Sequence, residues 1–172
     1  AVFNYALYLN MSESMTPIAS PDIMFCDEAH LVASEIENYM SAIVSERDII
    51  TEGWRRPRKL SVEGMADWAE ENIDDVKRGV ERFRKQIFAI TGASAGHTIK
   101  GSALSYRRLS TRYNRQRHLH RMLDLMIQAG RDNEVGKSWV FEKSGALYQV
   151  RPTVVDEYSD VLFGLAPRVV LM

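Results

Sequence analysis

The sequence of 172 residues has a single cysteine, Cys26, and no long uncharged hydrophobic run. One cysteine can form neither an internal disulfide nor a four-cysteine metal site, and this favours a reducing, intracellular setting, cytoplasmic or nuclear. No stretch approaches the roughly 20 apolar residues that a membrane-spanning helix needs. The composition therefore disfavours a disulfide-stabilised secreted domain and predicts a protein without a membrane partner.

An excess of either charge is also missing, because 22 basic and 23 acidic residues leave a formal net charge of −1. A chain with this balance does not attract nucleic acid over its whole surface, so any such contact must come from local basic clusters. With 45% hydrophobic residues the chain can bury a core. Its length suits one domain, or one domain with flanking pieces. Strand-like sequence at both ends leads us to expect an excised part of a longer protein.

The segment 22–30, D-I-M-F-C-D-E-A-H, matches a Walker B/DEAH motif. Its apolar part predicts a buried strand, which puts Asp27 and Glu28 at the carboxyl edge of a parallel sheet, where ligands bind. Phosphoryl transfer needs one carboxylate to hold Mg²⁺ and another group to orient or deprotonate the attacking water. We expect Asp27 to hold Mg²⁺ through water, Glu28 to act on the attacking water, and His30 to sense the γ-phosphate. The alternative is that D-E-A-H only caps the following helix.

Hydrophobic residues recur every three or four positions over long stretches after this motif. The predicted helices cover 29–44, 61–90 and 98–128. Ser61 is the expected N-cap of the second helix, and Gly130 is the expected stop of the third. Two long helices joined by the short turn 91–96 should pack as an antiparallel hairpin.

The other predicted elements are short. They are a helix over 4–11, a loop over 11–21, two strands within 138–150, a helix over 154–163 and a strand over 168–172. The expected fold is mainly α with minor β: a long helical hairpin and a small β-hairpin, flanked by parallel strands. We expect 23–26 and 169–172 to lie side by side in parallel.

The chain resembles the XPD/DinG group of superfamily-two DNA helicases in three stretches. These are V-F-N-Y-A-L-Y-L at 2–9, D-I-M-F-C-D-E-A-H at 22–30, and the segment 149–172, which in that family leads into an S-A-T motif. The resemblance implies RecA-like motor pieces at 1–44 and 151–172. It implies a helical Arch domain at 45–150, which bridges the motor to form a hole for single-stranded DNA and can recruit protein partners. It also implies an ATP-dependent DNA helicase, typically moving 5′ to 3′, with ATP and Mg²⁺ as cofactors.

The sequence departs from that family at several points. Leu31 stands where many members have Asn. The cysteines of an iron–sulfur cluster would lie before residue 1, so the presence of a cluster stays open. The phosphate-binding pattern G-x-x-x-x-G-K-[ST] is missing, so the chain alone should not hydrolyse ATP. The competing interpretation is a helical DNA-binding or protein-interaction module in which D-E-A-H is accidental.

A basic stripe runs from Lys100 to Arg121, with seven bases and no acid. Interleaved with Tyr106 and Tyr113, it suits single-stranded DNA, which is bound through phosphate neutralisation and base stacking. The candidate nucleic-acid-binding residues are Arg107, Arg108, Arg112 and Arg115, with a second cluster of Arg55, Arg56, Arg58 and Lys59. The alternative is that 115–121 pairs with the acidic helix start at 62–75, which leaves Arg107, Arg108 and Arg112 as the better DNA candidates.

Overall fold

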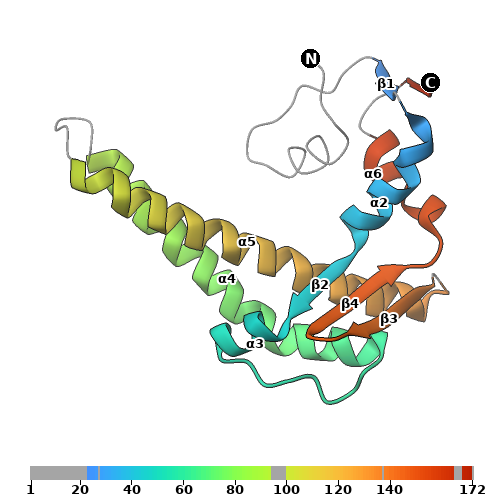
Figure 1. Ribbon diagram of the computed structural model, residues 1–172, viewed down its shortest axis with the longest axis horizontal. Helices are drawn as coiled ribbons and strands as arrows, with labels where there is room; N and C mark the ends of the chain where they lie inside the picture. Colours follow the sequence, from blue (N-terminus) through green and yellow to red (C-terminus); the bar gives the residue numbers. More distant parts are fainter. Residues whose placement is uncertain (1–22, 27, 94–99, 137, 165–167, 172) are drawn as a thin grey trace.

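The computed structural model describes residues 23–26, 28–93, 100–136, 138–164 and 168–171. The elements are β1 (Met24–Cys26), η1 (Ala29–Leu31), α2 (Val32–Met40), β2 (Ala42–Ser45), α3 (Glu46–Glu52), α4 (Val62–Ala93), α5 (Lys100–Glu134), β3 (Trp139–Ser144), β4 (Leu147–Pro152), η2 (Val155–Tyr158), α6 (Asp160–Phe163) and β5 (Val169–Leu171). This order confirms a mainly helical chain with minor β structure. Figure 1 shows α4 and α5 as a long arm with a small sheet across its base; α2 extends from that sheet away from the arm, and α6 and β1 lie toward its far end.

The arm consists of α4 and α5, which run antiparallel along their length (Figure 1). Their facing sides are apolar, as the three-to-four-residue spacing predicts. The buried side chains between them include Met65, Ala69, Val76, Leu119, Leu123 and Met126. Ser61 caps α4 as predicted, because its Oγ accepts a hydrogen bond of 3.1 Å from the N–H of Gly64. The arm is therefore held together chiefly by apolar burial along one seam.

Gly130 was expected to end the second long helix, and this prediction is wrong. α5 continues to Glu134, and Gly130 is buried within it. A Cβ added at Gly130 would lie 2.5 Å from the Cβ of Ala66 on α4. Glycine is required here because the two helices approach too closely for a side chain, not because the backbone must turn.

Replacing Gly130 by alanine should therefore lower the free energy of unfolding by about 1–3 kcal/mol, the usual cost of overpacking a filled interface. Helix propensity alone predicts the opposite sign, a gain of roughly 0.5–1 kcal/mol. Urea unfolding of the wild type and the variant, followed by circular dichroism, measures the difference. A variant more stable than the wild type would contradict the close approach of α4 and α5.

The segment 42–52 differs most from its predicted structure. The helix expected over 29–44 ends at Met40, and Ala42–Ser45 forms β2, which pairs with β4 in a sheet of order β2-β4-β3. Burial alternates along β2: Ala42 and Val44 are buried, whereas Ile43 is 40% exposed. A short apolar run suits a strand as well as a helix, so periodicity could not decide between them.

A second helix, α3, follows β2 directly, and the sequence pattern did not predict it. Its start is a capping box. The N–H of Asp48 donates to Ser45 Oγ, and the N–H of Ser45 donates to the Asp48 carboxylate, both at 3.2 Å. This reciprocal pair satisfies two backbone donors that the helix leaves free, and it fixes where α3 begins.

The predicted strand pair within 138–150 is present as β3 and β4, which are antiparallel. Trp139 on β3 packs edge-to-face against Tyr158 of η2, with ring centroids 5.4 Å apart. Both side chains donate to the Asp132 carboxylate of α5, the indole N–H at 3.2 Å and the phenol at 2.8 Å. The sheet, the end of α5 and η2 are thereby joined at one point.

β1 and β5 pair in parallel, with Met24 opposite Val169 and Cys26 opposite Leu171. The expectation that 23–26 and 169–172 lie side by side is confirmed for the described residues of both segments. Every other described element lies between them in the sequence. The helix and loop expected over 4–21 lie outside the described residues. In the described part of the chain, none of the helices combines the length and the apolar character that a membrane crossing requires.

Candidate functional site

The D-E-A-H residues come directly after β1, at its carboxyl end. Cys26 closes the strand and is fully buried, whereas Glu28 and His30 are exposed. Asp27, the expected Mg²⁺ carboxylate, lies outside the described residues. η1 starts at Ala29 and leads without a gap into α2. Glu28 and His30 therefore lie at the strand edge where parallel sheets bind ligands.

Glu28 has a φ of 52°, the only positive φ among the described non-glycine residues. The left-handed region is unfavourable for a residue with a Cβ, and such backbone strain costs about 1–3 kcal/mol. Strain of this kind is concentrated at active sites and ligand clamps. The backbone at Glu28 thus supports the functional interpretation of D-E-A-H over simple helix capping, which needs no strained residue.

The chemistry of the side chains at this edge fits a magnesium ion that arrives with a nucleotide. The described residues contain no group of three or more His, Cys, Asp or Glu side chains that could hold a metal by themselves. Mg²⁺ in nucleotide sites takes only one or two carboxylates, because phosphate oxygens and water fill its other positions. Asp27 and Glu28 are adjacent in the sequence and supply such oxygen donors.

Arg107, Arg108 and Arg112 are exposed in the half of α5 that is nearer the α4–α5 turn. They line one shallow hollow together with Leu104. No acidic residue in the described ranges forms an ion pair with any of the three. Their charges are therefore accessible to the phosphates of a nucleic acid.

Arg115 has a different environment from the other three candidates on α5. Its guanidinium forms ion pairs with Asp48 at 3.1 Å and Glu52 at 3.3 Å, both on α3. The neighbouring Gln116 donates to Glu52 at 2.8 Å. Arg115 was predicted to bind nucleic acid, with pairing to the acidic start of α4 as the alternative, and the structure pairs it with α3. Arg115 fixes α3 against the arm.

Burial alone would raise the pKa of Asp48, but hydrogen bonds from the Ser45 side chain and backbone, together with Arg115, outweigh it and lower the pKa below its ordinary value of 3.8. Because the pKa of Asp48 is lower in the folded than in the unfolded state, its charged carboxylate stabilises the fold at pH values above the unfolded-state pKa. This stabilisation is lost as the pH falls through the folded value.

We expect Asp48→Asn to lower the free energy of unfolding by about 1 kcal/mol at pH 7, because the neutral amide weakens the hydrogen bond from the Ser45 N–H and the ion pair with Arg115. The difference from the wild type should shrink as the pH is lowered toward 2, because protonation of Asp48 removes the charge that asparagine lacks. Urea unfolding at both pH values tests this, with the exposed Asp67→Asn as the control. An equal difference at both pH values would mean that the charge of Asp48 contributes nothing.

The second basic cluster, Arg55, Arg56, Arg58 and Lys59, is exposed on the connection between α3 and α4. It lines a hollow that also contains the acidic side chains Asp67 and Glu71. Arg56 pairs with Glu46 at 3.4 Å. Figure 1 places this connection at the base of the arm, whereas 107–112 lies toward the other end. The structure does not bring the two predicted clusters together.

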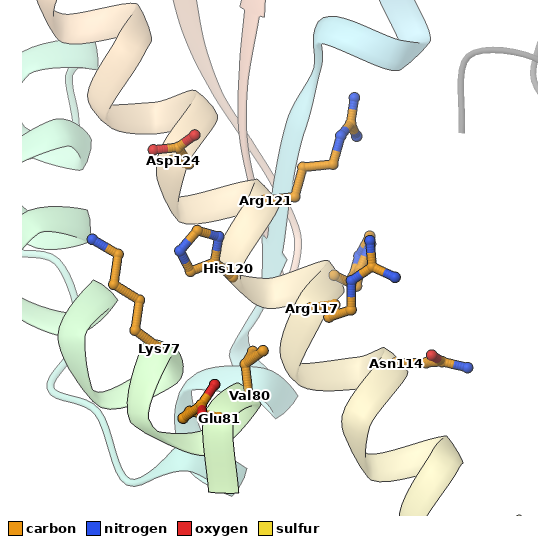
Figure 2. A pocket seen from close by; sticks show the side chains of 9 residues that line it. Lys77, Val80, Glu81, Asn114, Arg117, His120, Arg121 and Asp124 are labelled. Atoms are coloured by element: carbon orange, nitrogen blue, oxygen red, sulfur yellow. The ribbon is translucent and has the colours of Figure 1, made fainter. Parts of the chain in front are cut away.

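A groove along α5 escaped the sequence-based prediction. It has a cavity volume of about 520 Å³ and includes Asn114, Arg117, His118 and Arg121 of α5 and Lys77 of α4 (Figure 2). The α5 residues recur at three- and four-residue intervals, which places them on one side of a helix. That spacing could have identified this surface from the sequence. The candidate residues were instead chosen at 107–115, where basic residues are densest.

The described residues thus carry a strained acidic edge after β1 and two basic surfaces on α5, at 107–112 and in the groove. Comparison with protein-family models gives no match, and comparison with curated proteins gives none either. The case for a function therefore rests on how these surfaces and the paired strands are arranged.

Proposed function

We propose that this chain is part of an ATP-dependent DNA helicase of the XPD/DinG type, comprising the DEAH strand, an Arch-like insertion and the strand that follows it. The supporting observation is the parallel pairing of β1 with β5. Parallel neighbours need a crossover connection, and here the crossover contains the whole arm and its small sheet. An insertion between two adjacent strands of a RecA-like sheet would have this arrangement.

In this proposal the carboxyl end of β1 contributes to an ATP site. Asp27 holds the magnesium ion through water, and Glu28 orients or deprotonates the water that attacks the γ-phosphate. When bound, ATP with Mg²⁺ supplies the phosphoryl group whose hydrolysis drives movement. The phosphate-binding loop is absent from these 172 residues and must come from elsewhere in the protein that carries this chain.

The proposed role of His30 is to pass the state of that site to the arm. His30 lies in η1, which leads directly into α2, and β2 follows one residue after α2. Arg151 of β4 also pairs with Glu37 of α2 at 2.6 Å. A shift of η1 would therefore be carried along α2 to the sheet at the base of the arm.

The proposed role of the arm is to guide single-stranded DNA. The accessible charges of Arg107, Arg108 and Arg112 suit phosphates, which are the same at every base, so binding should not depend on sequence. Movement in the 5′ to 3′ direction follows from the resemblance to the helicase family.

The test is the ATP hydrolysis rate of the protein that carries this chain, measured with and without single-stranded DNA. Unwinding of partial duplexes with a 5′ or a 3′ overhang gives the direction. We expect hydrolysis to be stimulated by DNA and the 5′ overhang to be preferred. DNA binding without any ATP hydrolysis would favour the alternative, a helical DNA-binding module. Absence of both activities would reject both functions.

A further inference from the structure

The groove on α5 begins where the arm meets α2. The Arg121 guanidinium lies over the Tyr39 ring, 3.9 Å from its centroid, and donates a hydrogen bond to the Tyr39 carbonyl in the last turn of α2. From there the groove follows α5 through Arg117 to Asn114. These residues are three and four positions apart, so they follow one another along one side of the helix.

The arginines and the carboxylates of this groove lie on different sides of it, and Lys77 lies on the side of the carboxylates. Figure 2 shows Asn114, Arg117 and Arg121 projecting from one side of α5, whereas His120 and Asp124 lie on the side nearer to Lys77 and Glu81 of α4. Arg117 is exposed and has no ion pair with any acid in the described part of the chain. Its guanidinium lies 5.8 Å from the Tyr113 ring centroid. A polyanion would thus be attracted to the α5 side, whereas Lys77 and Glu81 on the α4 side already have ion-pair partners within α4.

Helical spacing divides the arginines of α5 into two rows that lead to different elements. Arg108 and Arg112 continue into Arg115, which is fixed against α3. Asn114 and Arg117 continue into Arg121, which contacts α2. Only the second row leads to the helix that follows Glu28 and His30.

We propose that the α5 side of the groove is a phosphodiester-binding site for a single strand of DNA, with Arg117 as its main contact. Asn114 lies about 4.5 Å farther along the helix axis and donates to the neighbouring phosphate or sugar. Arg121 marks the end at α2. The contacts are to the backbone, so the site does not select a base sequence. The inference rests on the proposed function, since it takes DNA as the ligand.

The experiment measures binding of fluorescently labelled dT20 by anisotropy. Arg117→Glu should raise the dissociation constant about tenfold at low salt, and it should make the dependence of binding on salt less steep because phosphate contacts are lost. Asn114→Glu, which adds a negative charge to the same row, should also weaken binding several-fold. The matched controls are Arg82→Glu and Gln86→Glu, exposed on the opposite flank of α4 from Lys77, and they should bind at least three times more tightly than the groove variants.

Circular dichroism first establishes that each variant is folded, which is expected because Asn114 and Arg117 are exposed. Wild-type affinity in both groove variants would overturn the site. If Arg108→Glu with Arg112→Glu weakens binding and the groove variants do not, the groove inference fails while DNA binding by the arm stands. If the groove variants weaken binding but the protein that carries this chain hydrolyses no ATP, the site stands and the helicase proposal fails.

Discussion

If the proposed function is right, replacing Glu28 by glutamine is expected to reduce DNA-stimulated ATP hydrolysis about 10²- to 10⁴-fold in the protein that carries this chain. Glutamine keeps the size of the side chain but cannot accept a proton, and general-base catalysis contributes rate factors of this order. Glu28 is exposed at the end of β1, where water and nucleotide can reach it. Steady-state ATPase assays at saturating single-stranded DNA measure the loss.

The matched control is Glu35→Gln, the same substitution seven residues farther along, in the first turn of α2. It should leave the hydrolysis rate close to that of the wild type, because α2 has by then left the sheet edge. ATP and DNA affinities of the Glu28→Gln variant should also stay near wild type, since the change removes a proton acceptor and not a binding surface. An undiminished rate in Glu28→Gln would show that D-E-A-H is not a catalytic motif here.

Truncation of Leu123 to alanine should lower the free energy of unfolding by about 2–5 kcal/mol. Leu123 is 0% exposed in the seam that holds the arm together, so the deleted atoms leave a cavity that the two helices cannot close completely. Urea unfolding followed by circular dichroism measures the change. Leu104→Ala provides the control, because Leu104 lies on the same helix and is 58% exposed.

That control should change the free energy of unfolding by no more than about 0.5 kcal/mol, as is usual for surface positions. A small effect at Leu123 together with a large one at Leu104 would mean that α4 and α5 do not pack through this seam. Equal effects would show that the loss of stability does not depend on burial in this seam.

The long helices and the pairing of the end strands could be predicted because their patterns are local and repeat many times. α4 carries its apolar side over many turns and starts at a serine cap, both visible in the sequence. The strand pairing was expected because the resemblance to helicases places both short apolar runs in one parallel sheet. Such repeated patterns leave few alternative structures.

The errors occurred where a residue's role depends on a partner far away in the sequence. Gly130 resembles a helix stop until Ala66 is known to lie against it. β2 resembles the end of a helix until β4 is known to pair with it. In the candidate site, the partners of Arg115 on α3 and of Arg121 on α2 are likewise tertiary contacts. Sequence spacing can identify a basic face, but it cannot say which of its residues are already engaged.

The pairing of β1 with β5 has a consequence for the order of folding. Each strand has three residues, and the loop that their pairing closes contains every other described element. Closing so long a loop costs conformational entropy that three residue pairs cannot repay early, whereas only six residues of sequence separate the described ends of α4 and α5. The arm should therefore form first and bring the strand ends together. On gentle unfolding the strands should separate while the arm is still intact, and amide hydrogen exchange would show this as early loss of protection at β1 and β5.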